Sequence, residues 1–158
     1  MFSKLIGTDD VMRLLGLNDK SELERMVAEE LLKPSREGQK GPLFLVADIV
    51  MFRLAQVIAH VGVDSQKAKR YAEAILGTRL QAHDNNVVDW VENEAQELFC
   101  LIADNQLARI FLRSKDDSKE VDVGAVKPVL LPTTKCEINV FRVIRPVVLK
   151  ARQLLGSK

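Results

Sequence analysis

Three cationic side chains, those of Lys33, Arg36 and Lys40, lie in a short stretch of the sequence that is rich in proline and glycine. That stretch, residues 33–42, predicts a loop or the tip of a β-hairpin, because both residue types interrupt regular secondary structure. Lysine and arginine side chains presented on a hairpin can contact the phosphates of a nucleic acid. Short basic sets are also common on protein surfaces, so the same residues could serve only to keep a loop hydrated.

Patterns typical of enzymes and metal sites are missing from the sequence. It has no glycine-rich phosphate loop, no nucleophile elbow, no HExxH zinc motif and no cysteine–histidine set with a recognisable spacing. Cys100 and Cys136 form no CxxC pair, and we expect both to be buried as small apolar residues. We therefore expect no enzymatic activity, no metal ion and no cofactor, and no pattern points to a particular small-molecule effector.

The overall charge gives little support for nucleic-acid binding. The 158 residues carry a formal net charge of +1, whereas domains that bind phosphates usually have a clear basic excess. The two halves are similarly balanced, with 11 basic and 11 acidic residues in 1–76, and 12 and 11 in 77–158. A nucleic-acid site must therefore depend on the local arrangement of charges.

Apolar residues are spread along the chain and never form the run of about 18 that a membrane-spanning helix needs. The first residues also lack the basic segment and apolar core of a signal peptide. We therefore expect a cytoplasmic protein with no membrane partner.

Two short helices should precede the basic stretch. Thr8, which is followed by two aspartates, predicts the start of the first helix, and Gly16 predicts its end. Asn18 or Asp19 can cap the second helix, which has apolar residues at helical spacing along one face. Its opposite face carries charged residues, so we expect that face to be exposed.

The basic stretch should lead into a strand, Leu43–Val46, and two further helices. Asp48 is expected to cap the third helix, and Asp64 with Ser65 to start the fourth. Helix, glycine turn, helix, basic hairpin and helix is the order of a winged helix-turn-helix. Its second helix can enter a DNA major groove, which is about 12 Å wide, while the hairpin lies over the flanking phosphates.

Residues 5–76 resemble the DNA-binding domains of the MerR type and of the phage-excisionase type. The matching positions are Ile6–Leu17, Leu23, Met26, Val27, Leu31, Leu32, Pro34, Phe44, Asp48, Ile49 and Val61–Ser65. Domains of these types contact DNA with the exposed face of the second helix and with the wing. The resemblance therefore implies a winged helix-turn-helix domain over residues 1–80. The residues that it implicates in DNA binding are Lys20, Ser21, Glu24, Arg25, Lys33, Arg36 and Lys40.

Residues 87–158 predict a smaller, strand-rich region that ends in a helix. Residues 98–112 have the pattern of a strand–turn–strand hairpin. Further short strands are expected at Val121–Val123, Val129–Leu131 and Cys136–Val140. The final helix, Phe141–Leu155, has more apolar surface than so small a sheet can cover. We therefore expect a dimer contact through this helix, formed by Phe141, Ile144, Val148 and Leu155.

The expected fold class is α+β, with a small antiparallel β region after the helical N-terminal half. The favoured function is a DNA-binding transcriptional regulator that acts as a homodimer on double-stranded DNA. The alternative is a protein–protein interaction module built on the same scaffold. Glu22 and Glu24 support the alternative, because both would repel phosphates unless they accept hydrogen bonds from cytosine amino groups.

Overall fold

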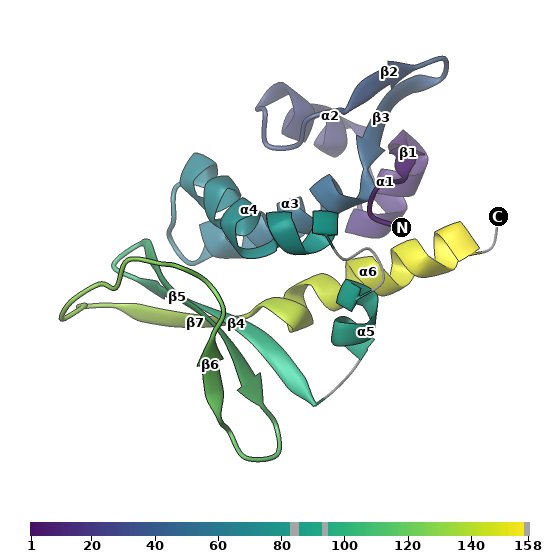
Figure 1. The fold of residues 1–158 in the computed structure, drawn as a ribbon. Coiled ribbons are helices and arrows are strands. Elements are labelled where there is room, and N and C mark those ends of the chain that lie inside the picture. The colour runs from purple at the N-terminus through teal and green to yellow at the C-terminus, as the bar shows by residue number, and fades with distance from the viewer. Residues whose placement is uncertain (83–85, 93–94, 157–158) are drawn as a thin grey trace.

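The chain has an α+β fold with two antiparallel sheets, which confirms the predicted class (Figure 1). The computed structural model describes residues 1–82, 86–92 and 95–156. In chain order, the elements are β1 (Leu5–Gly7), α1 (Thr8–Leu15), α2 (Lys20–Ala28), β2 (Arg36–Gly38), β3 (Gly41–Leu45), α3 (Val46–His60), α4 (Ser65–Ala82), α5 (Asn86–Glu92), β4 (Gln96–Ala103), β5 (Gln106–Ser114), β6 (Glu120–Asp122), β7 (Lys135–Asn139) and α6 (Val140–Gly156). Among the helices described, none has both the length and the apolar character needed to cross a membrane.

Local signals set the boundary between the first two helices. Helix α1 ends at Gly16, whose φ of 71° is left-handed and whose N–H donates to the carbonyl of Met12. Asp19 caps α2 by accepting a hydrogen bond of 2.9 Å from the N–H of Ser21. Both of these predictions are confirmed. Thr8, by contrast, is already the first helical residue, and no side chain caps α1.

The N-terminal sheet has the strand order β1–β3–β2. Strands β2 and β3 form an antiparallel hairpin that turns through Gln39 and Lys40 and resumes at Gly41, whose φ is 111°. Strand β1 pairs with the other edge of β3 and places Ile6 opposite Phe44, and both side chains are buried. The base of the hairpin is therefore anchored in the core, while its tip is exposed.

Helix α3 continues directly from β3 and begins at Val46, two residues before the predicted cap. The prediction that Asp48 caps this helix is wrong. The first N–H groups of α3 already have acceptors, because Val46 donates to the carbonyl of Lys4 and Ala47 donates to that of Phe2. Asp48 lies instead in the first turn of the helix.

Helix α4 begins as predicted, directly after Asp64. The carboxylate of Asp64 accepts hydrogen bonds of 3.1 Å from the N–H groups of both Gln66 and Lys67. Helices α3 and α4 then pack against each other over much of their length (Figure 1).

The C-terminal sheet has the strand order β6–β5–β4–β7. The predicted hairpin is present as β4 and β5, joined by a turn at Asp104 and Asn105, whose φ values of 49° and 60° are left-handed. Strands β6 and β7 lie close to two of the predicted short strands. The third predicted strand, Val129–Leu131, is wrong, because those residues form a loop. Prolines at both ends of that segment have no N–H to donate to a neighbouring strand.

Helix α6 joins the two halves of the molecule. It packs against α1, α3, α5 and β4, and in Figure 1 it extends from the four-stranded sheet across to the N-terminal helices. Its buried residues recur at helical spacing: Val140, Phe141, Ile144, Val147, Val148 and Ala151. One continuous core of apolar side chains runs through both halves, so the predicted segments 1–80 and 87–158 do not have separate cores.

The residues predicted to form a dimer contact lie mostly inside a single chain. Phe141, Ile144 and Val148 are buried, and Leu155 is half-buried. The apolar surface that suggested a contact between chains is therefore covered by elements of the same chain. The first three residues are not available for that contact in this fold, and the homodimer itself stays a prediction.

Candidate nucleic-acid interface

Helix α2 has one buried and one exposed face. Leu23 and Met26 are buried and attach the helix to the core. All four side chains predicted to contact DNA from this helix are exposed, namely those of Lys20, Ser21, Glu24 and Arg25. The segment thus presents the predicted residues to solvent, as a helix that enters a groove must do.

The three predicted residues of the basic stretch are also exposed. Lys33 precedes β2, Arg36 begins it and Lys40 lies in the hairpin turn. Between the first two, Ser35 fixes the base of the hairpin. Its N–H donates to the carbonyl of Leu43 at 2.8 Å, and its hydroxyl accepts from the N–H of Leu45 at 3.3 Å. These bonds hold the cationic side chains on a well-defined backbone.

The hydroxyl of Ser35 also connects the hairpin to α3. It donates to a carboxylate oxygen of Asp48 at 3.4 Å. Burial raises the pKa of Asp48, because removing the carboxylate from water disfavours its charged form, while the hydrogen bond from Ser35 acts in the opposite direction. Asp48, predicted as a helix cap, therefore has a different structural role.

Helix α2 and the hairpin lie at one end of the molecule. In Figure 1 they are grouped around β3, and the four-stranded sheet is at the opposite end. The fold therefore brings the two predicted groups of DNA-binding residues into one region, although they are separated in sequence by the end of α2 and the loop after it.

The charges in this region are mixed. Residues 19–40 contain five basic and six acidic side chains. One pair, Lys20 and Glu24, forms an exposed ion pair of 3.7 Å across one helical turn, which contributes little to stability in water. Exposed cations on the hairpin and exposed carboxylates on α2 therefore occur in the same region of the fold.

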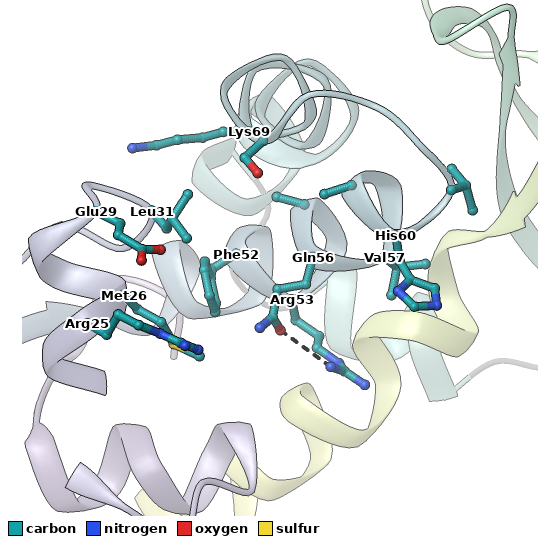
Figure 2. Close-up of a pocket in the computed structure, with 14 residues that line it drawn as sticks. Arg25, Met26, Glu29, Leu31, Phe52, Arg53, Gln56, Val57, His60 and Lys69 are labelled. Atoms are coloured by element: carbon teal, nitrogen blue, oxygen red, sulfur yellow. Dashed lines mark hydrogen bonds between the residues drawn. The ribbon is translucent and has the colours of Figure 1, made fainter. Parts of the chain in front are cut away.

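A groove that sequence analysis missed lies between α2, α3 and α4 (Figure 2). Its volume is about 620 Å³, and apolar side chains such as Met26 and Phe52 form its floor. Arg25 lines the groove and also belongs to the predicted DNA-binding set. No sequence signal identifies this site, because its walls come from three helices that only the tertiary fold brings together.

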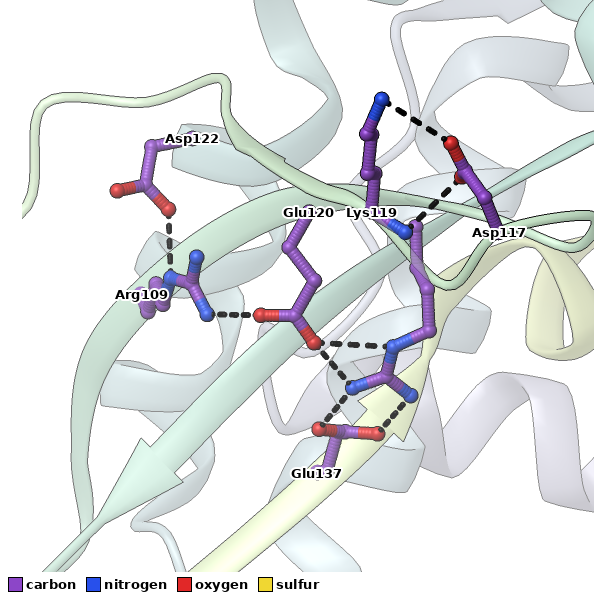
Figure 3. A network of polar contacts seen from close by, with 7 residues as sticks. Arg109, Asp117, Lys119, Glu120, Asp122 and Glu137 are labelled. Carbon is purple, nitrogen blue, oxygen red and sulfur yellow. Dashed lines mark hydrogen bonds and ion pairs between the residues drawn. The ribbon is translucent and has the colours of Figure 1, made fainter.

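A second unpredicted feature is a charged network on the outer face of the four-stranded sheet (Figure 3). Arg113 forms two hydrogen bonds with Glu137, of 2.7 and 2.9 Å, and two with Glu120, of 2.7 and 3.0 Å. Arg109 also pairs with Glu120 and with Asp122. These bonds raise the pKa of both guanidiniums and lower that of Glu120, because each partner favours the charged form of the other.

The network covers a pair of aromatic rings. Phe99 and Phe111 stack with their centroids 5.5 Å apart. The guanidinium of Arg113 lies 4.4 Å from the centroid of Phe99, and that of Arg109 lies 4.3 Å from that of Phe111. The outer face of the sheet is thus sealed by its own residues, and the cations there already have carboxylate partners.

The two cysteines differ in burial. Cys100 is buried and Cys136 is half-buried, so the expected burial is confirmed fully for the first and in part for the second. Burial raises the pKa of the Cys100 thiol to about 12, with a smaller contribution from Cys136. Within residues 1–82, 86–92 and 95–156, no cluster of histidine, cysteine and acidic side chains could hold a metal ion.

Comparison of the sequence with protein-family models and with curated proteins found no match. The resemblance of residues 5–76 to the MerR and excisionase types therefore depends on the matching positions named above.

Proposed function

We propose that this chain is a DNA-binding transcriptional regulator with an N-terminal winged helix-turn-helix. Helix α2 would enter the major groove, and the β2–β3 hairpin would act as the wing on the flanking backbone. The observation that carries this proposal is the joint exposure of the seven predicted residues on α2 and on the anchored hairpin at one end of the fold.

Within this proposal the residues have different tasks. Lys33, Arg36 and Lys40 neutralise phosphates and fix the orientation of the protein on the duplex. Arg25 and Glu24 lie on the exposed face of α2, where an arginine can pair with guanine and a carboxylate can accept from a cytosine amino group. The carboxylates on α2 would therefore favour sequence selectivity at the expense of general affinity.

A salt titration of binding to mixed-sequence duplex DNA tests the proposal. We expect the logarithm of the binding constant to fall linearly with the logarithm of salt concentration, because each phosphate contact releases counterions. Replacing Arg25, Arg36 and Lys40 together with alanine should reduce the slope by up to about three and weaken binding strongly.

A matched control is the replacement of Lys119, Lys127 and Lys135 with alanine, which removes the same charge from exposed positions in the C-terminal region. We expect this variant to retain the slope of the unchanged protein. Equal losses in the two triple variants would indicate attraction by net charge alone and would contradict a defined interface.

The second candidate function is a protein-interaction module on the same scaffold. It is favoured by the six acidic side chains in residues 19–40, which oppose the approach of a phosphate backbone. Absence of duplex binding even at low salt, with circular dichroism showing a folded protein, would support this candidate and refute the first.

A further inference from the structure

The groove between α2, α3 and α4 has the size and lining of a ligand site. Its volume of about 620 Å³ lies within the range of about 300–1,000 Å³ typical of small-molecule pockets. Met26, Leu31, Phe52, Ala55 and Val57 give it an apolar floor. A mostly apolar floor with few polar groups favours a ligand whose body is also apolar.

The charged groups at its edge are mainly cationic. Arg25, Arg53 and Lys69 line the groove, and Glu29 is the one acidic residue among the lining residues. Lys69 donates to the backbone carbonyl of Glu30 at 3.2 Å, which also links α4 to the end of α2.

Arg25 and Arg53 approach the groove from different helices. Figure 2 shows the Arg25 side chain beside Met26 and the Arg53 side chain beside Gln56, farther along the groove. Arg53 donates to the side-chain carbonyl of Gln56 at 3.3 Å. Within the part of the chain that the structure describes, neither arginine has a carboxylate within 4.0 Å. These cations are therefore available to an anion, unlike Arg109 and Arg113 on the outer sheet.

We propose that this groove binds a small amphipathic carboxylate. The apolar body would lie along α3, and the carboxylate would accept hydrogen bonds from Arg25 and Arg53. Guanidiniums suit this task because their planar N–H groups match the two oxygens of a carboxylate. The lining residues Phe52 to His60 span about 12 Å of helix at 1.5 Å per residue, which favours an elongated ligand such as an acyl chain. This site shares Arg25 with the proposed duplex contact, but binding of a carboxylate there does not require the protein to bind DNA.

Calorimetric titration of the full chain with decanoate tests the site, and decyltrimethylammonium provides a cation with the same alkyl chain. We expect decanoate to bind at one site and the cation at least tenfold more weakly, because only the carboxylate matches the two guanidiniums. In methyl-detected NMR spectra, decanoate should shift the signals of Met26 and Val57, which line the groove.

Variants on the groove give a sharper test. Arg25→Gln and Arg53→Gln should each weaken decanoate binding about tenfold, because each removes one charge-assisted contact. Arg36→Gln is the matched control, since Arg36 is also exposed but lies on the hairpin outside the groove, and it should leave the affinity unchanged. Gln56→Glu should weaken binding in a second way, by giving Arg53 a carboxylate partner.

Several results would overturn the proposal. They are the absence of decanoate binding, equal affinity for the ammonium compound, and methyl shifts confined to the C-terminal sheet. Equal effects of Arg53→Gln and Arg36→Gln in folded variants would likewise show that only general charge attraction is involved.

Discussion

Replacing Ile144 with alanine should destabilise both halves of the molecule together. Ile144 is fully buried on α6. This helix packs against α1 and α3 of the N-terminal half and against α5 and β4 of the C-terminal half. The substitution removes three buried carbons, each contributing about 0.8 kcal/mol of transfer free energy. The cavity left behind adds to this loss, so we expect the free energy of unfolding to fall by about 3–4 kcal/mol.

That loss is large compared with the usual stability of a domain, which is about 5–15 kcal/mol. For a chain of this length it should lower the melting temperature by roughly 10 °C. Scanning calorimetry and urea denaturation measure the change, and native-state hydrogen exchange reports α3 and β4 separately. Leu130→Ala is the matched control, because Leu130 is 85% exposed and its truncation should change stability by no more than about 0.5 kcal/mol.

Two results would refute the reasoning about Ile144. Two separate transitions, with exchange in α3 unaffected by the substitution, would show that the halves have independent cores. A melting temperature of the unchanged protein that rises steeply with protein concentration, and loses this dependence in Ile144→Ala, would place Ile144 between two chains. The second result would restore the dimer contact expected from the sequence.

Three further outcomes follow from local features of the fold. Gly16→Ala should cost about 1 kcal/mol in unfolding experiments because of the left-handed φ of 71°. Gly7→Ala should cost less, because a φ of −85° in open space suits alanine and only the preference for glycine at the N-cap of α1 is lost. In a Cys136→Ser background, Cys100 should not react with a thiol reagent at pH 8 until the protein unfolds, because a pKa of about 12 leaves about one thiolate in ten thousand. Hydrogen bonds from two backbone N–H groups lower the pKa of Asp104 below its usual 3.8, so wild type should be more stable than Asp104→Asn at neutral pH. In acid titrations monitored by circular dichroism, this advantage should disappear as the pH falls through the lowered pKa of Asp104. If wild type stayed more stable than Asp104→Asn below that pH, the charge of Asp104 would not be the cause.

Features whose determining interactions are local could be predicted from the sequence. Gly16 ends α1 through its own backbone conformation, and Asp19 and Asp64 cap the helices that follow them directly. The prediction for Asp48 failed because the first N–H groups of α3 donate to carbonyls near the N-terminus, a long-range pairing that no local sequence pattern indicates. The strand predicted at Val129–Leu131 failed as well, because residue types that favour strands have no neighbouring strand to pair with among the described residues.

In the candidate sites, too, local features could be predicted and features that depend on the tertiary fold could not. Exposure of Lys20, Arg25 and Arg36 could be predicted, since it follows from helix periodicity and from the hairpin. The groove needs the relative placement of three helices, and the shielding of Phe99 needs the register that brings Arg113 across from β5. The sequence correctly indicated that α6 has more apolar surface than the small sheet can cover. The expected dimer contact did not take into account that α1 and α3 of the same chain pack against this helix.

Arg25 connects the two proposals, since it lies on the exposed face of α2 and also lines the groove. A carboxylate held by Arg25 would remove one cation from the surface offered to DNA, and by thermodynamic linkage DNA would weaken carboxylate binding by the same factor. Single substitutions separate the effects, because Arg36→Gln should weaken only duplex binding and Arg53→Gln only decanoate binding, whereas Arg25→Gln should weaken both. If Arg25→Gln weakened only one of them, the site it spared would have to form without this guanidinium, and the proposed competition between ligand and duplex would not occur.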